Sequence, residues 1–262
     1  MYTMQQIEAP TFATQRSPLI AQISAFLKES KAKPVNYFAN IVFVPNTPSV
    51  AGGIISADVY KSLFEINFDT VISIAPSGIG DFKRITACSL DTYTSPLGDV
   101  VVDDRIRNEL CDEDDDIYLD DTGHFNMTGI DVQLPFLQTV LGEFTVVPLV
   151  MGSETVDFCK ELGSAVGEIM FNRNTLTVVC MDILKASPKG LKMFKRALID
   201  LDVSRMMTLL NQENEIVVQG KGGVISAMIA ATHRRYKRVH VCDLVAPTND
   251  VHGFVGALIG RG

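Results

Sequence analysis

The stretch TVVPLVMGSETVDFCKELGSAVGEIMFNRNTLTVVC (residues 145–180) decides the fold. It begins and ends with short apolar runs rich in Val and Thr, at residues 145–150 and 175–180, and each run has the length of a buried β-strand. Between them, residues 156–170 have the length and the apolar spacing of a helix. Strands that alternate with helices are typical of βαβ units, in which a helix connects two strands of a mostly parallel sheet. This stretch therefore predicts an α/β protein.

The same alternation extends outward in both directions. Helices are expected at residues 17–28, 57–64, 190–198, 203–213 and 222–235, and strands at residues 41–44, 70–75, 85–90, 100–102, 238–244 and 254–259. No linker rich in Pro, Ser or Gly and no internal repeat interrupts the pattern. We expect residues 1–262 to form one domain of three α/β/α layers, in which helices cover both faces of a mixed, mostly parallel sheet.

The composition excludes several classes of protein. Hydrophobic residues make up 47% of the 262 residues and charged residues 21%, which excludes disordered, collagen-like and fibrous chains. The net charge of −8 argues against a nucleic-acid-binding protein. The first ten residues lack the features of a signal peptide, and no apolar run approaches the roughly 20 residues that span a bilayer. The 5 cysteines are scattered without a C-x-x-C spacing, so we expect reduced thiols in a cytoplasmic protein that binds no membrane.

Two charged runs have ordinary structural explanations. The acidic run at residues 112–116, followed by Asp120 and Asp121, lacks the glycine and the spaced ligands of an EF-hand, so we predict a solvated loop. The basic run HRRYKR (residues 233–238) follows the end of a predicted helix. We expect its cations to complement the negative end of that helix dipole, and an anion-binding patch is the alternative.

Polar side chains follow four of the predicted strands, and ligands bind at the carboxyl ends of strands in open α/β sheets. The segments at residues 44–49, 75–80, 179–185 and 217–223 contain the candidate residues Asn46, Ser77, Asp182, Lys185, Gln219 and Lys221. The glycines around Lys221 precede a predicted helix, where free backbone N–H groups form a generic anion site, although the P-loop spacing is absent. Asp182 and Lys185 are candidates for a catalytic acid–base pair, although structural ion pairs are commoner.

Three further blocks, LDTYTSPLGDV (residues 90–100), IDVQLPFL (residues 130–137) and FTVVPLVMG (residues 144–152), occur in the order and spacing of a known family. Over about residues 10–260 the chain resembles the Memo family, whose bacterial and archaeal members are labelled protein B of the AmmeMemoRadiSam system. The fold of that family is similar to the class III extradiol, LigB-like dioxygenases, which use non-haem iron. The resemblance implies AMMECR1-like and radical-SAM proteins as partners.

The departures from the family pattern concern the metal site. The resemblance implies two early histidines and a late cysteine as metal ligands, and Asn46, Gly78 and Gln219 stand at those three positions. Asp131 and Gln133 replace a Glu and a His of a further motif, whereas Asp182 keeps an acid and Lys185 replaces the histidine that follows it. The 4 histidines, His124, His233, His240 and His252, all fall elsewhere. Amides and glycine bind Fe, Cu or Zn poorly, so we expect no metal and no cofactor.

Three hypotheses about function follow. One is a non-catalytic, pseudoenzyme-like binding or scaffold protein with a degenerate metal site. Another is a structural subunit of a larger assembly. The remaining one is a metal-free enzyme or a binder of small anions. Its crevice would be formed by Asn46, Ser77, Gly78, Asp131, Gln133, Asp182, Lys185, Gln219 and Lys221. An iron-dependent dioxygenase ranks last among the functions considered. The chain could also hold a metal through ligands at other positions, drawn from Cys180, Asp182, His240 and Cys242.

Overall fold

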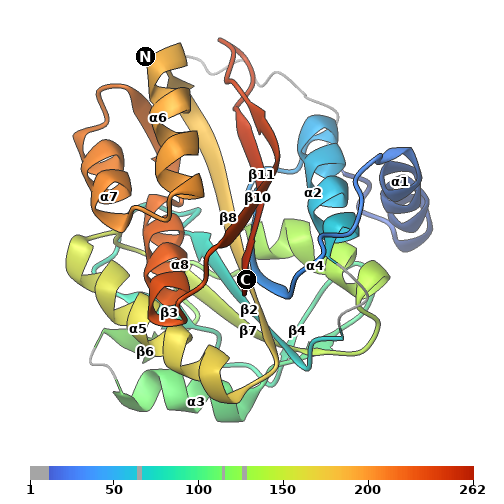
Figure 1. The fold of residues 1–262 in the computed structure, drawn as a ribbon. Coiled ribbons are helices and arrows are strands. Elements are labelled where there is room, and N and C mark those ends of the chain that lie inside the picture. The colour runs from blue at the N-terminus through green and yellow to red at the C-terminus, as the bar shows by residue number, and fades with distance from the viewer. Residues whose placement is uncertain (1–11, 64–66, 114–115, 126–128) are drawn as a thin grey trace, which may run out of the picture.

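The computed structural model describes residues 12–63, 67–113, 116–125 and 129–262. A central sheet runs through the molecule (Figure 1), and its strands are ordered β10-β11-β1-β8-β2-β7-β3-β6, with β9 paired to β8. These strands are β1 (Ala39–Pro45), β2 (Thr70–Pro76), β3 (Ile85–Ala87), β6 (Ile117–Leu119), β7 (Thr145–Met151), β8 (Thr175–Ala186), β9 (Ile216–Gln219), β10 (Arg238–Val245) and β11 (Phe254–Gly260). A separate pair joins β4 (Thr92–Tyr93) to β5 (Val100–Val101).

The strands β1, β8, β2 and β7 are mutually parallel, and antiparallel strands lie on both sides of them. On one side β11 runs antiparallel to β1 and β10 antiparallel to β11, while on the other β3 runs antiparallel to β7. The predicted mixed, mostly parallel sheet is confirmed. The parallel strands β1, β2 and β7 end at Pro45, Pro76 and Met151, so these three residues mark one edge of the sheet.

Helices cover both faces of the sheet, because successive side chains of a strand point to opposite faces. Ile41 and Phe43 of β1 belong to one hydrophobic core, and Val42 and Val44 belong to the other. The first core is closed by α3 (Asp104–Glu113), α5 (Val156–Asn172), α6 (Pro188–Ile199), α7 (Val203–Gln212) and α8 (Lys221–His233). The second is closed by α1 (Arg16–Glu29), α2 (Val50–Ser62) and α4 (Gly129–Val140). This arrangement is the predicted three-layer α/β/α architecture.

Helix α2 begins earlier than predicted, at Val50 rather than residue 57, and residue 64 at its predicted end lies outside the described residues. The two glycines in its first turn disfavour a helix by intrinsic propensity, which is why the pattern of apolar residues missed this turn. Ser49 caps the helix by accepting a hydrogen bond from the Gly52 N–H. Gly53 packs under the Phe26 ring of α1, where an added Cβ would lie 2.5 Å from a ring carbon. Tertiary packing therefore outweighs propensity here.

The charged runs agree only partly with prediction. The chain from Asp104 to Glu113 is helical, residues 114–115 lie outside the described part of the chain, and Asp116 precedes β6. Asp120 forms an ion pair with Arg84, and Asp121 accepts hydrogen bonds from the Ser89 N–H and hydroxyl. The last two acids of the predicted solvated loop are therefore bonded to the fold. In the described part of the chain, no helix has the length and apolar character that a bilayer-crossing segment needs.

Candidate functional site

The strand ends bring Asn46, Asp182 and Gln219 together, as the sequence predicted. Asp182 lies in β8 opposite Gln219 of β9, and Asn46 directly follows β1. Asp182 is fully buried, and its Oδ1 accepts a hydrogen bond of 3.0 Å from the Asn46 backbone N–H. Its Oδ2 accepts a hydrogen bond from the hydroxyl of Thr47, which sequence analysis did not single out. We call this region, at the edge marked by Pro45, Pro76 and Met151, the crevice, because it is where the sequence predicts a ligand site.

His252 also contacts Asp182, although it was not among the residues predicted to lie in the crevice. Its Nδ1 lies 3.4 Å from Asp182 Oδ2, and its side chain is 44% exposed. The hydrogen bond to Asp182 raises the pKa of this imidazole above its usual value, and partial burial opposes the shift. Two hydrogen bonds of 2.8 Å between the backbones of Ile183 and Gly253 hold the β10–β11 loop against β8. The sequence signal for this contact was the position of His252 in the loop between the strands predicted at residues 238–244 and 254–259.

Lys185 and Asp182 do not form the predicted acid–base pair. Lys185 is exposed and lies opposite Val217 of β9, past an irregularity in the pairing of the two strands. Among the described residues, Asp182 contacts Asn46, Thr47 and His252, and no ion pair joins it to Lys185. The carboxylate is therefore a structural acceptor that ties β1 to β8 and to the β10–β11 loop.

Gln133 is a core residue of α4 rather than a lining residue of an open crevice. Its side chain is fully buried, its Nε2 donates to the Pro45 carbonyl at 2.7 Å and to Ser56 Oγ at 3.1 Å, and its Oε1 accepts from the Tyr60 hydroxyl at 3.0 Å. Both donors and the acceptor of the amide are used. Gln133 therefore fastens α4 to α2 and to the end of β1.

The N-terminus of α8 is already held by a carboxylate, which sequence analysis also missed. Glu154 follows β7, and its Oε1 accepts a hydrogen bond of 2.9 Å from the Gly222 N–H. Burial raises the pKa of Glu154 to about 7, against the opposing effect of that hydrogen bond and of Lys221. Lys221 itself pairs with Glu213. The expectation of free N–H groups at this helix end is therefore wrong for Gly222, because the chain supplies its own anion.

The remaining predicted residues lie around the crevice without joining Asp182. Ser77 donates its backbone N–H to Met151 and accepts a hydrogen bond from the Ile79 N–H, so it shapes the turn after β2. Gly78 is exposed. Asp131 lies in the first turn of α4 and is partly buried. Gly129 begins that helix so close to β8 that an added Cβ would lie 2.3 Å from Cys180 Cβ and 2.5 Å from Asn46 Oδ1.

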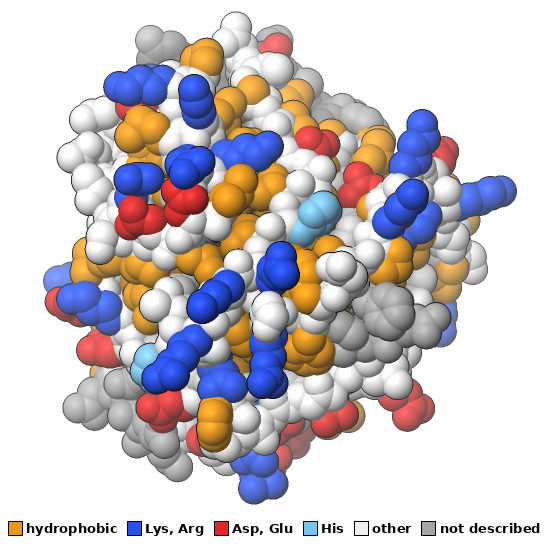
Figure 2. All heavy atoms as spheres, viewed as in Figure 1, with side chains coloured by type: hydrophobic (Ala, Val, Ile, Leu, Met, Phe, Trp, Pro, Cys, Tyr) orange, Lys and Arg blue, Asp and Glu red, His pale blue; other side chains and the backbone are white. Residues whose placement is uncertain are grey.

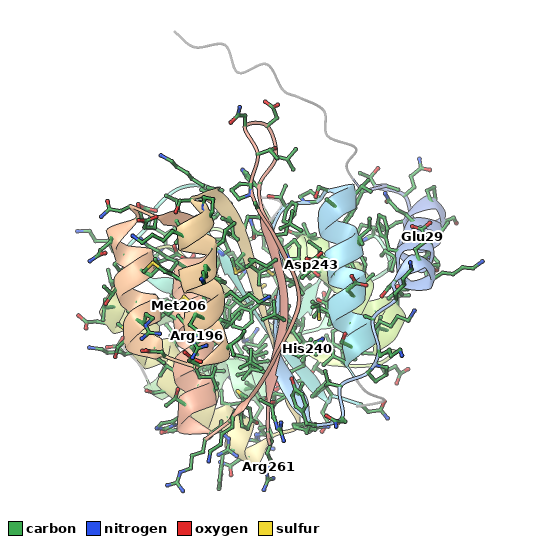
Figure 3. The ribbon with its side chains drawn as sticks, turned by 45° about the horizontal axis from the view of Figure 1, so that its top comes forward. Glu29, Arg196, Met206, His240, Asp243 and Arg261 are labelled. Carbon is green, nitrogen blue, oxygen red and sulfur yellow. The ribbon has the colours of Figure 1, made fainter. Side chains whose placement is uncertain are left out.

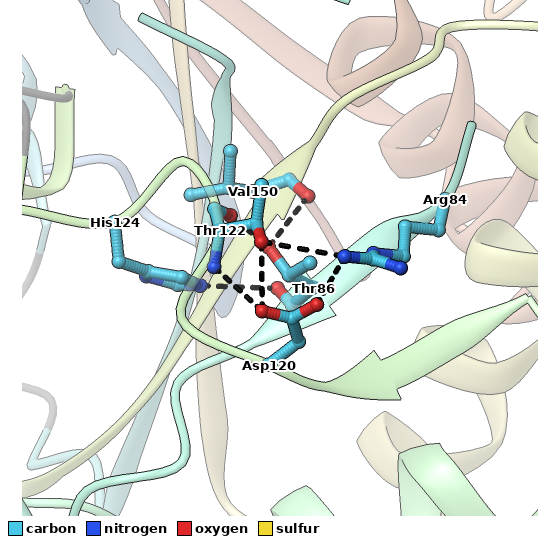
Figure 4. Close-up of polar contacts among 6 residues, drawn as sticks. All are labelled: Arg84, Thr86, Asp120, Thr122, His124 and Val150. Carbon is cyan, nitrogen blue, oxygen red and sulfur yellow. Dashed lines mark hydrogen bonds and ion pairs between the residues drawn. The ribbon is translucent and has the colours of Figure 1, made fainter. Parts of the chain in front are cut away.

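A second polar cluster joins the beginning of β3 to the loop after β6 (Figure 4). Asp120 pairs with Arg84 and accepts hydrogen bonds from the backbone and hydroxyl of Thr122. The buried His124 contacts the Thr86 carbonyl, and desolvation lowers the pKa of this imidazole. Because these groups bond to one another and to backbone carbonyls, the cluster fixes the loop to β3.

Comparison with known proteins identifies the family. The family model described as Memo-like protein matches residues 10–255. The chain belongs to the Memo family.

Memo relatives match most of the chain at low identity. A MEMO1 family protein of Nitrosopumilus maritimus is 25% identical over 227 residues, covering 84% of this chain and 82% of its own. One from Methanopyrus kandleri is 29% identical over 241 residues, covering 84% and 83%. An uncharacterized protein from Escherichia coli K12, of known structure, aligns with a TM-score of 0.54 at 10% identity and covers 84% of this chain and 99% of its own. That last likeness concerns the fold alone.

The residues at the implied metal positions of this Memo chain do not fit a transition metal. Asn46 and Gln219 offer neutral amides, and Gly78 offers no side chain. Cys180 is fully buried, and burial raises the pKa of its thiol far above the usual value, which disfavours the thiolate that metals bind. In the described ranges, no group of three His, Cys, Asp or Glu residues is close enough to hold a metal ion. We therefore derive no chemistry through a metal.

Proposed function

We propose that this Memo-family protein has lost metal-dependent chemistry at the crevice and acts as a binding or scaffold protein. The observation that carries the proposal is the replacement of the three implied ligands by Asn46, Gly78 and Gln219 within an otherwise intact Memo fold. The acid that the family pattern keeps, Asp182, supports this reading because its oxygens accept hydrogen bonds from Asn46 and Thr47.

Metal analysis of the purified protein tests the first part of the proposal. After expression in medium supplemented with iron, copper and zinc, the wild-type chain is expected to retain far less than one metal ion per chain. The matched control is the triple variant Asn46→His, Gly78→His and Gln219→Cys, which restores the implied ligands and is expected to retain more metal. Stoichiometric metal that survives dialysis of the wild-type protein would contradict the proposal.

The scaffold role requires partners, and we propose AMMECR1-like and radical-SAM proteins on the basis of the family relationship. Co-expression of the chain with such proteins from the same genome, followed by size-exclusion chromatography, tests this part. We expect a co-eluting complex. A chain that remains monomeric at micromolar concentration with no co-eluting partner would count against the scaffold role and against the larger assembly alike.

A second candidate function is binding of a small molecule in the crevice without a metal. It is favoured by Asn46, whose Oδ1 is buried and has no hydrogen-bond partner among the described residues. A buried acceptor without a partner is unfavourable by about 1–3 kcal/mol, so a ligand that donates a hydrogen bond there would be favoured. A thermal-shift screen of metabolites that carry N–H or O–H donors tests this candidate, with Asn46→Ala as the variant that should lose any shift. A flat screen would eliminate it.

A further inference from the structure

Basic residues are concentrated in the C-terminal part of the chain. Residues 185–262 contain 12 of the 23 Lys and Arg residues but 6 of the 31 Asp and Glu residues, so this part carries a charge of +6 and the rest −14. Figure 2 shows Lys and Arg side chains gathered on one face, where the chain ends and β10 begins. An acidic protein therefore presents a basic surface, which the net charge of −8 conceals.

The turn after α8 holds several of these cations in fixed positions. The backbone N–H groups of Arg234, Arg235 and Tyr236 donate to Ala230, Thr232 and Ala231 at 2.9 Å each. Arg235 adopts a left-handed conformation with φ of 55°, and Tyr236 is buried, which anchors the turn. These backbone bonds close the end of the helix, and the side chains of Arg235 and Lys237 remain exposed.

The paired ends of β10 and β11 add two more cations. Arg238 begins β10 opposite Gly260 of β11, so Arg261 follows directly beside it, and both side chains are exposed. In Figure 3 Arg261 lies at the end of the hairpin farthest from its loop. Since His252 in that loop contacts the crevice, these cations lie at the opposite edge of the sheet. Among the described residues, Arg234, Arg235, Lys237, Arg238 and Arg261 form no ion pair.

A groove with apolar lining opens beside these cations. Its volume is about 540 Å³, and it is lined by Val203, Ile229, Thr232, His233 and Arg235, from the start of α7 and the end of α8. The acidic residues near the start of α7 are occupied: Asp200 pairs with Arg196, and Asp202 pairs with Arg205. We call this space and the five unpaired cations the cationic groove.

An exposed aromatic ring adds to the mixed character of this surface. Phe171, near the end of α5, is 69% exposed, and the Arg234 guanidinium lies 4.4 Å from the centre of its ring. Arginine and aromatic side chains are enriched at protein–protein interfaces, where an aromatic ring supplies contact area and arginine supplies several donors. The apolar side chains Val203 and Ile229 distinguish this surface from a patch of hydrated cations alone.

We infer that the cationic groove is a docking site for an acidic segment of a partner protein, one that inserts an apolar side chain between α7 and α8. Carboxylates of the segment pair with the unpaired arginines, and the apolar side chain contacts Val203 and Ile229. Nucleic acid is disfavoured because the whole molecule is acidic and the groove is apolar inside. The inference goes beyond the proposed function, since it concerns the opposite edge of the sheet and holds whether or not the crevice binds metal.

Fluorescence anisotropy with a labelled twelve-residue peptide of alternating Leu and Glu tests the inference. We expect binding that weakens when the salt concentration rises from about 0.05 M to about 0.3 M, since exposed ion pairs are screened. The double variant Arg235→Glu and Arg238→Glu should weaken binding by about tenfold or more. A peptide with Ser in place of Leu should also bind more weakly, because it cannot fill the apolar lining.

The matched control is Lys28→Glu and Lys33→Glu, which changes the net charge equally on exposed residues at the end of α1 and just beyond it. It should bind the peptide as wild type does. The milder variant Arg235→Gln and Lys237→Gln replaces the first pair if the glutamates impair folding. Absent peptide binding, or equal losses in the control, would overturn the inference. Tighter binding of a dT oligonucleotide or of phosphatidylserine vesicles would overturn the assignment to an acidic protein.

Discussion

At the scale of single residues, the crevice is organised by two carboxylates in different environments. Asp182 is fully buried and receives hydrogen bonds from Asn46 and Thr47, which follow β1, and from His252 in the β10–β11 loop. Glu154 is partly buried and receives one from the start of α8. Asp182 could be predicted from the sequence because it lies just past the strand predicted at residues 175–180, although β8 continues through it to Ala186. Its partner His252 could not, since 70 positions separate the two residues and the backbone bonds between Ile183 and Gly253 bring them together.

The His252–Asp182 contact predicts a pH-dependent contribution to stability. Because the pKa of His252 is raised in the folded state, its contribution is fully present below the ordinary histidine pKa and is lost as pH rises through the raised value. The ring is 44% exposed, so we expect less than about 1 kcal/mol. Urea unfolding should show His252→Gln to be destabilised more at about pH 5.5 than at about pH 8.5. His240→Gln, on exposed β10, is the control, and a loss independent of pH would contradict the assignment.

Substitution of Glu154 is expected to stabilise the protein, whereas substitution of His252 is expected to destabilise it. Its pKa is raised to about 7, so ionisation is disfavoured in the folded state, and stability falls as pH rises from the ordinary glutamate value towards 7. Glu154→Gln retains an acceptor for the Gly222 N–H but cannot ionise. We expect this variant to unfold with a free energy higher by roughly 1–3 kcal/mol at about pH 8, and with little change at about pH 4.5. The exposed Glu143→Gln should show no such trend, and an unstable Glu154→Gln at pH 8 would refute the argument.

At the scale of elements, prediction succeeded where periodicity was strong and failed where local propensity opposed the fold. Helices α5 and α7 begin where predicted, at Val156 and Val203. Helix α4 was not predicted as a helix, because Pro135 lies inside it and its first residue is Gly129. The strand predicted at residues 175–180 continues to Ala186 because β9 pairs with its second half. These errors arise because tertiary contacts determine the local structure at these positions, and the pattern of a single sequence does not contain those contacts.

The buried amide of Gln133 fastens α4 to α2 and to the end of β1, which predicts a large effect of one substitution. Gln133→Ala leaves the Pro45 carbonyl, the Ser56 hydroxyl and the Tyr60 hydroxyl without their partner. Each lost bond to a buried group is unfavourable by about 1–3 kcal/mol, although relaxation and water entry reduce the sum. We expect a total loss of roughly 2–4 kcal/mol in denaturant unfolding. The exposed Gln212→Ala, at the end of α7, should lose less than about 0.5 kcal/mol, and a similar loss in both would show that the Gln133 bonds contribute little.

At the scale of the whole molecule, the fold class was predicted correctly because strands and helices alternate along nearly the entire chain. Parallel pairing of β1, β8, β2 and β7 then follows from their crossover connections. The basic run at residues 233–238 was identified from the sequence, with an anion-binding patch as the alternative, but the total of −8 does not reveal how many basic residues lie in the C-terminal part of the chain. The sequence also predicted that Asn46, Asp182 and Gln219 lie near one another at the strand ends, whereas the bonds that Asp182 forms depend on long-range contacts.

The same architecture predicts that both faces of the sheet unfold together. Each central strand gives alternate side chains to the two cores, as Phe43 and Val42 of β1 do, so neither core can dissolve without removing the support of the other. The chain contains no tryptophan, so one substitution per face supplies a local probe. Phe194→Trp reports on the core under α6, and Phe136→Trp on the core under α4. In each variant we expect the fluorescence transition in urea to coincide with the loss of helix measured by circular dichroism. A fluorescence transition that precedes the loss of helix in one variant alone would show that its face of the sheet unfolds independently. The helices of that face would then be held by their own contacts rather than by the shared sheet.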